Sequence, residues 1–212
     1  LYIQSDRSQP EGTKERTHIR TLELPDGSWV EVPLVVVRGA RPGPVFYMGA
    51  ALHGDEINGV EILSTVASGV DVGDLQGTLL VVPVQNPLAF RIQHRYYLGH
   101  MIKSPMDQGA ADPWSSFPGD PDGNMAGLIA HTLFQRLMEP ADYVMDVHTP
   151  TTGGRYAPFA FLPPPRCGGP LFFRKPAKRS SVSSADRDVI QLLLPIVAVE
   201  NDLGQRLPRV GA

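Results

Sequence analysis

Hydrophobic and polar positions at the start of the chain predict two strands joined by a turn. Residues 17–24 alternate between the two classes with a period of two, and residues 29–38 return as a second strand-like run. Between them lie Pro25, Asp26 and Gly27, which are typical turn residues because Pro presets φ and Gly permits positive φ. The chain therefore opens with a predicted β-hairpin.

Further along, apolar runs alternate with segments of helical spacing. Residues 45–51, 78–84 and 142–147 are short apolar runs, as expected of buried strands. Residues 55–67 and 124–137 carry apolar side chains at intervals close to 3.6. Strands that alternate with helices predict an α/β fold, with a mixed central sheet flanked by helices on both faces.

Composition narrows the class of protein. The net charge of -3 gives no reason to expect nucleic acid or a membrane surface as a partner. No apolar run approaches the roughly 20 residues that span a bilayer, and residues 1–20 lack the apolar core of a signal peptide. Cys167 is the single cysteine, which excludes an internal disulfide and a cysteine-rich zinc site. We therefore expect a cytoplasmic protein.

Three residues have the chemistry of a metal site. His53 and Glu56 directly follow one predicted buried strand, and His148 ends another. Ligands in open α/β sheets bind beyond the carboxyl ends of the strands. Two imidazoles and a carboxylate leave a fourth position for water, as catalytic zinc requires. Asp146, on the same strand face as His148, would orient that ligand. Taken alone, these residues have plainer explanations. His53 and Glu56 would form a helix cap or a solvated face, and Asp146 would be a strand-end acid bonded to a backbone N–H.

Four stretches carry a family resemblance. They are GAALHGDEINGVEIL (49–63), NPLAFRIQHRY (86–96), FPGDPDGNMAGLIAHTLF (117–134) and ADYVMDVHTPTTGGRYAPF (141–159). In this order they resemble the succinylglutamate desuccinylase and aspartoacylase family, which is similar to the zinc carboxypeptidases. The resemblance implies a zinc carboxypeptidase-like fold and one zinc ion per chain, held by the two histidines and the glutamate.

The resemblance also implies two catalytic roles. Arg95 falls where the family keeps an arginine that polarises the scissile carbonyl, although a surface arginine is the alternative. Glu200 ends an apolar run like the one that precedes the family's general base. Only 51 residues separate His148 from Glu200, which is short for the family. An ordinary strand-end glutamate is therefore the alternative for Glu200.

One stretch departs from the family pattern. Trp114 and Ser115 occupy positions where the family usually has an Asn-Arg pair that grips a substrate carboxylate. A serine cannot replace a bidentate arginine, so the preference for free carboxylates is in doubt. Trp114 would form an aromatic wall or simply pack. Arg155 and Tyr156, in the loop after His148, are further candidates for substrate binding, with a solvated loop as the alternative.

We therefore expect residues 1–212 to form a single catalytic domain. It would comprise an N-terminal hairpin region (1–42), a zinc-binding core (43–165) and a divergent C-terminal segment (166–212). The expected reaction is hydrolysis of an amide or ester of a small acyl substrate by metal-activated water. The partners would be that substrate and a second copy of the chain in a homo-oligomer. A metal-binding but catalytically weak relative is the main alternative. A serine hydrolase ranks lower because no G-x-S-x-G motif is present.

Overall fold

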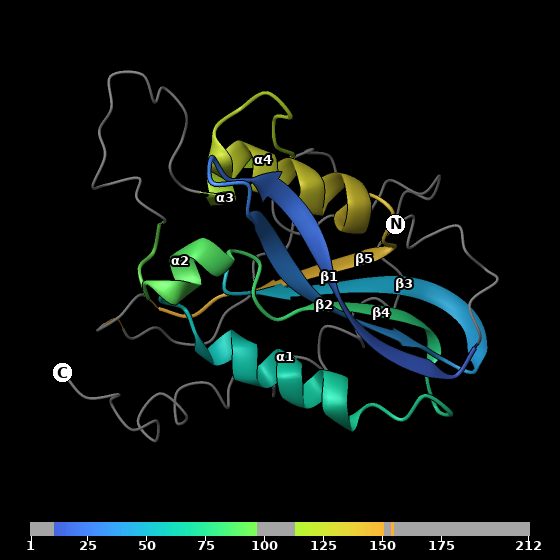
Figure 1. The fold of residues 1–212 in the computed structure, drawn as a ribbon. Helices are drawn as coiled ribbons and strands as arrows, with labels where there is room; N and C mark the ends of the chain where they lie inside the picture. Colours follow the sequence, from blue (N-terminus) through green and yellow to red (C-terminus); the bar gives the residue numbers. More distant parts are fainter. Residues whose placement is uncertain (1–10, 97–112, 151–153, 155–212) are drawn as a thin grey trace, which may run out of the picture.

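The computed structural model describes residues 11–96, 113–150 and 154 (Figure 1). The strands are β1 (Thr13–Glu23), β2 (Trp29–Arg38), β3 (Arg41–Ala50), β4 (Gln76–Val82) and β5 (Tyr143–Val147). The helices are α1 (Asn58–Gly69), α2 (Pro87–Arg91), α3 (Pro113–Ser116), α4 (Met125–Leu133) and a π-helical turn, η1 (Phe134–Met138). Within the described ranges, no helix has the length and apolar character needed to cross a bilayer.

The strands form one mixed sheet in the order β1-β2-β4-β3-β5. β1 and β2 make the predicted antiparallel hairpin, in which Ile19 lies opposite Val32. β2 then pairs antiparallel with β4. β3 lies between β4 and β5 and runs parallel to both. The prediction of a mixed central sheet is confirmed.

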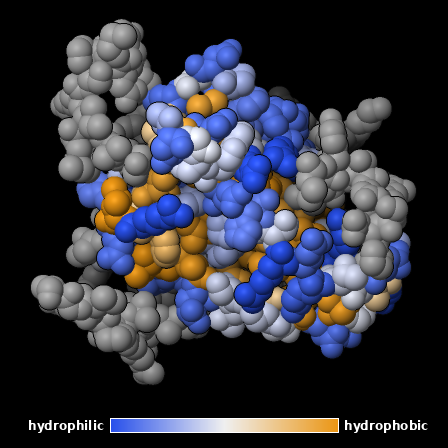
Figure 2. All heavy atoms as spheres, in the orientation of Figure 1, coloured by the Kyte–Doolittle hydropathy of each residue, from blue (hydrophilic) through white to orange (hydrophobic). Residues whose placement is uncertain are grey.

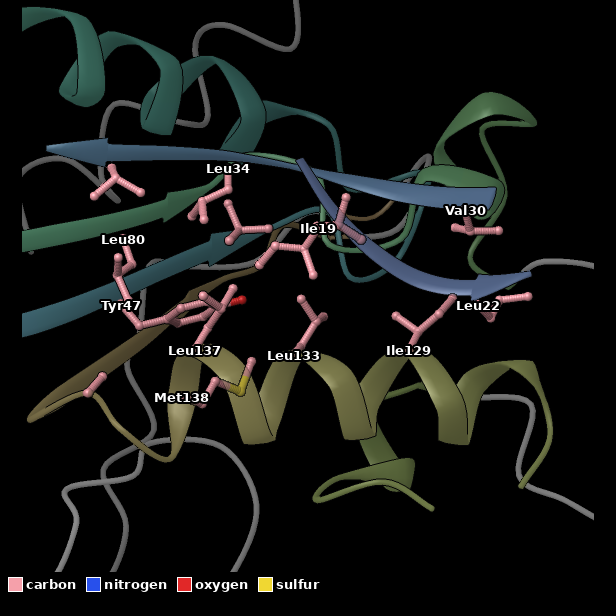
Figure 3. Close-up of a cluster of buried hydrophobic side chains, with 14 of the residues drawn as sticks. Ile19, Leu22, Val30, Leu34, Tyr47, Leu80, Ile129, Leu133, Leu137 and Met138 are labelled. Atoms are coloured by element: carbon pink, nitrogen blue, oxygen red, sulfur yellow. The ribbon is translucent and has the colours of Figure 1, made fainter. Parts of the chain in front are cut away.

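One face of the sheet is covered by α4 and η1. Leu133 and Leu137 of this helical segment are completely buried. They pack with strand residues that point to the same face, among them Leu34, Tyr47 and Leu80 (Figure 3). Burying each of these large side chains stabilises the fold by roughly 1.5–3 kcal/mol before ordering costs are counted. This packing makes the larger of the two apolar clusters found among the described residues.

The opposite face is covered by α1 (Figure 1). Its residues Leu63 and Ala67 pack with Met48 of β3 and Val81 of β4. Successive strand side chains point to opposite faces, so Met48 faces α1 while its neighbour Tyr47 faces α4. Helices therefore flank both faces of the sheet, as the sequence predicted.

Two helix boundaries differ from the sequence prediction. The helix expected from residue 55 begins at Asn58, because the preceding residues form a separate turn in which Glu56 N–H donates to His53 O at 3.2 Å. The second helix, expected over 124–137, changes to a π-helical turn at Phe134, where Glu139 N–H donates to Phe134 O. Two adjacent residues at the end of this turn, Leu137 and Met138, are both buried in the core.

The parallel strands place their carboxyl ends at one edge of the sheet. β3, β4 and β5 lead there to His53, Gln85 and His148 respectively. On the face shown in Figure 2, polar residues cover most of the described surface, while apolar residues gather around α2. The carboxyl ends of β3, β4 and β5 are thus the place where the fold brings the chemistry-bearing residues together.

Candidate metal centre

The connection from β3 to α1, residues 51–57, is termed the ligand loop. Its first residue, Ala51, has a positive φ of 47° and turns the chain away from the strand. The hydrogen-bonded turn between His53 and Glu56 then brings both side chains to one side. As a result, His53 Nδ1 lies 2.8 Å from Glu56 Oε1.

Gly54 allows the ligand loop to pack against α2. A Cβ atom at Gly54 would lie only 2.1 Å from the carbonyl carbon of Ala89. Asn86 caps the start of α2, because its side-chain oxygen accepts the Ala89 N–H at 3.2 Å. Pro87 follows in the first turn, where a missing N–H costs nothing. The Asn-Pro pair thus fixes a short helix that leads the chain toward Arg95.

β5 supplies the third candidate ligand. His148 directly follows the strand, and its Nδ1 lies 2.9 Å from Glu56 Oε2. The other ring nitrogen, Nε2, lies 2.7 Å from Asp146 Oδ2. One potential ligand atom from each of His53, Glu56 and His148 lies within 4.8 Å of the other two.

The donor set fits zinc. Two imidazole nitrogens and one carboxylate are the protein ligands of several catalytic zinc sites. His53 and Glu56 are only 1% and 3% exposed, so little water competes with the metal on their side. A carboxylate on the far nitrogen of a ligating histidine is a recurrent feature of metal sites, and Asp146 occupies that position. The same donors also suit Mn, Fe, Co or Ni.

Glu56 is held from four directions. Its Oε1 accepts from His53 Nδ1 and from Arg95 Nη1, the latter at 2.9 Å. Its Oε2 is bonded to His148 Nδ1 and accepts the backbone N–H of Thr149 at 3.1 Å. Arg95, whose side chain is 31% exposed, also donates from Nε to the hydroxyl of Tyr96. The arginine therefore lies directly beside the ligand set.

The cluster shifts the pKa values of its members. Burial would raise the pKa of Glu56, but hydrogen bonds and positive charge from His148 and His53 lower it to about 2. Burial would lower the pKa of His148, but the charge and hydrogen bond of Asp146, together with Glu56, raise it to about 10. Binding a metal at His148 Nδ1 must therefore displace a proton.

Trp114 lies over the two histidines. Its ring is stacked on that of His53, with an interplanar angle of 11° and centroids 6.3 Å apart. It meets the His148 ring edge-on, with centroids 4.8 Å apart. Ser115, the next residue of α3, is exposed. Of the candidate substrate-binding residues Trp114 and Ser115, the tryptophan thus lies against the ligand set.

The fold brings together the predicted ligands, Asp146, Arg95 and Trp114. Arg155, Tyr156 and Glu200 lie outside the described residues. Sequence reasoning missed Gln85, a completely buried amide bonded to Asp146. The one available signal was its position at the end of a buried strand, just before Asn86 and Pro87.

Sequence comparison connects this chain with a known family. A family model for the succinylglutamate desuccinylase/aspartoacylase catalytic domain matches residues 42–167. An N-alpha-acetyl-L-2,4-diaminobutyric acid deacetylase from Halomonas elongata is 34% identical over 140 residues, which are 63% of this chain and 37% of the relative.

Solved structures show the same relationship. A succinylglutamate desuccinylase/aspartoacylase from Rhodobacter sphaeroides aligns with a TM-score of 0.54 and 29% identity, over 64% of this chain and 40% of that one. The product-bound ectoine utilization protein EutE (DoeB) from Ruegeria pomeroyi aligns with a TM-score of 0.50 and 31% identity, over 65% and 40%. The chain thus spans less than half the length of these relatives. Because the family model matches more than half of the chain, the chain belongs to the succinylglutamate desuccinylase/aspartoacylase family.

Proposed function

We propose that the protein is a zinc-dependent hydrolase that cleaves an amide or ester bond of a small acyl substrate. The observation that carries the proposal is the convergence of His53, Glu56 and His148, whose ligand atoms lie within 4.8 Å of one another. Membership of a family named for desuccinylase and aspartoacylase activities supports the reaction class. A zinc ion held there would lower the pKa of water and polarise a carbonyl.

Arg95 is proposed to stabilise the oxyanion that develops on the scissile carbonyl. Its guanidinium lies against Glu56, 2.9 Å from Oε1, and keeps part of its side chain exposed. A fixed cation beside the reacting centre lowers the barrier because it interacts more strongly with the oxyanion than with the neutral carbonyl. Glu200 remains the proposed general base, on the basis of the sequence pattern alone.

The substrate is proposed to be an N-acyl amino acid or a small acyl ester without a need for a free carboxylate. Trp114 supplies an aromatic surface over the two histidines where the family usually has a polar clamp. Such a surface favours apolar groups next to the scissile bond. Arg155 and Tyr156 remain proposed substrate contacts. Cytoplasmic location and homo-oligomerisation also remain proposals.

The decisive experiment pairs metal analysis with activity. The purified protein should contain about one zinc per chain and should hydrolyse a small ester or an N-acyl amino acid. Chelation should abolish turnover and added zinc should restore it. His53→Asn should lose both metal and activity, whereas His18→Asn, an exposed histidine on β1, should retain both. Failure of the wild-type protein to bind metal would refute the proposal. Metal without turnover would indicate a binding protein.

Substrate preference is tested separately. The protein should show similar kcat/KM values for an N-acyl amino acid and for the same compound with its carboxylate blocked as an amide. A strong preference for the free acid would contradict the role proposed for Trp114. Glu200→Gln should bind zinc normally but lose most of its kcat, and unchanged turnover would exclude Glu200 as the base.

A further inference from the structure

A chain of buried hydrogen bonds leads from the core to the candidate ligand His148. The hydroxyl of Tyr47 donates to Gln85 Oε1 at 2.8 Å. Gln85 Nε2 donates to Asp146 Oδ1 at 2.6 Å, and Asp146 Oδ2 lies 2.7 Å from His148 Nε2. Tyr47 and Gln85 are completely buried, and the Asp146 side chain is 6% exposed. The chain therefore runs through the interior of the sheet face and ends at the metal centre.

The absence of a side chain at Gly49 makes this route possible. Gly49 of β3 lies opposite Val82 of β4 on one side and Asp146 of β5 on the other. Gln85 follows β4, so its amide must cross β3 to reach Asp146. A Cβ at position 49 would lie 2.5 Å from Gln85 Cδ and 2.7 Å from both amide heteroatoms. The amide thus occupies the space that any other residue at position 49 would fill.

The donors and acceptors along the chain have only one consistent direction. Burial, with the charge of Asp146, raises the pKa of Tyr47 well above its ordinary value, so the phenol stays protonated and donates. The Gln85 oxygen accepts from Tyr47, which leaves its NH2 group to donate to Asp146. The carboxylate accepts on both oxygens, so His148 must carry its hydrogen on Nε2. Nδ1, 2.9 Å from Glu56 Oε2, is then the ring nitrogen that would bind a metal once its proton is displaced.

Burying the Gln85 amide and the Tyr47 hydroxyl costs desolvation free energy, which packing alone does not require. An apolar side chain at position 85 would fill the same space without the desolvation that a buried amide and hydroxyl require. Gln85 is placed at the point where it fixes one oxygen of Asp146, and Asp146 in turn contacts His148 through the other oxygen. A fixed carboxylate holds the imidazole in one tautomer and one orientation.

We propose that Tyr47 and Gln85 are positioning residues that hold His148 in its metal-binding orientation through Asp146, and that Gly49 provides the passage for the amide. The proposal rests on the zinc site proposed above. It extends that site from its three ligands to two residues in the core of the sheet. Neither Tyr47 nor Gln85 would touch metal or substrate.

The test measures zinc affinity by competition with a chromophoric chelator, with thermal stability measured in parallel. Gln85→Met keeps the volume and removes the amide, and should weaken zinc binding roughly tenfold, the low end of the range for such outer partners. Tyr47→Phe, a milder change that keeps the ring and lies one hydrogen bond further from His148, should weaken binding less than Gln85→Met does. In both variants kcat should fall while KM changes little. The substitutions disturb the metal ligand His148 and leave the substrate pocket intact.

Leu133→Ala is the control for a purely structural role. Leu133 is completely buried in the cluster that contains Tyr47 but lies on α4. Its truncation should lower stability and leave the zinc affinity of the folded protein unchanged. If Gln85→Met and Tyr47→Phe behave like Leu133→Ala, with lower stability and unchanged affinity, the positioning role is excluded.

Gly49→Ala provides an independent variant. The added methyl group should displace the Gln85 amide and weaken zinc binding about as much as Gln85→Met. Gln85→Ala removes the atoms that the methyl group meets. The double variant Gly49→Ala/Gln85→Ala should therefore bind zinc nearly as well as Gln85→Ala alone. If the losses of zinc-binding free energy in the two single variants simply add in the double variant, Gly49 does not act by making room for the Gln85 amide. Zinc binding by wild type with unchanged affinity in all variants would refute this inference alone, whereas no binding by wild type would refute the proposed function as well.

Discussion

Glu56→Gln tests the electrostatic design of the centre without requiring a metal. Each carboxylate oxygen of Glu56 faces one group that can only donate, Arg95 at Oε1 and the Thr149 N–H at Oε2. A glutamine has one oxygen and one NH2 group. Whichever way the amide is turned, its NH2 group faces one of these two donors, and that hydrogen bond is lost.

The size of the effect follows from burial. A buried donor that loses its partner costs about 1–3 kcal/mol, and more where a charge is involved. Glu56 is 3% exposed, but Arg95 is partly solvated, which reduces its share of the loss. We expect Glu56→Gln to lower the free energy of unfolding of the metal-stripped protein by roughly 2–3 kcal/mol. For a chain of this size the melting temperature should fall by roughly 4–12 °C.

The assay is urea denaturation at pH 7 in the presence of a chelator. Glu15→Gln, an exposed glutamate on β1, is the matched control and should stay within about 0.5 kcal/mol of wild type. Equal stability of the two variants would refute the reasoning, because it would mean that Glu56 is not the acceptor on which Arg95 and Thr149 converge.

Three further predictions concern the core, the charge state and the ligand loop. Leu133→Ala should lower the free energy of unfolding by about 3–5 kcal/mol in urea; a loss below about 1 kcal/mol would contradict the packing. The free energy of unfolding of the metal-stripped protein should fall as the pH drops from 4.5 toward 2, because Glu56 becomes protonated. It should also fall as the pH rises from 6.5 through about 10, because His148 loses its proton. In pH-dependent denaturation, Glu56→Gln should lack its share of the acid loss, and an unchanged acid limb would contradict the assignment. Gly54→Ala should displace the ligand loop from α2 and reduce zinc stoichiometry, whereas Gly69→Ala, with open space around it, should not; equal zinc content would refute the packing argument.

The sequence by itself determined the order and type of most elements. Periods of two and 3.6 follow from strand and helix geometry, so the hairpin of β1 and β2, the buried strand β3 and the amphipathic α4 were readable before any contact was known. The candidate ligands were also readable, because each follows directly on a buried strand and parallel strands align their carboxyl ends.

Tertiary structure decided what those residues contact. Local periodicity carries no information on contacts between segments far apart in the chain, so the ion pair of Arg95 with Glu56 and the stacking of Trp114 on His53 emerged only from the fold. The start of α1 at Asn58 was missed for the same reason, since the turn before it is stabilised by a hydrogen bond that apolar spacing does not record.

Gln85 shows the limit most clearly. Its role depends on Tyr47 and Asp146, which are 38 and 61 positions away in the chain, and on the missing side chain at Gly49. A buried amide after a strand has no distinctive pattern in a sequence, because its hydrogen-bond partners are chosen by strand order. That order, β4-β3-β5, is a property of the folded sheet, and it alone places the glutamine within reach of Asp146 and the candidate metal centre.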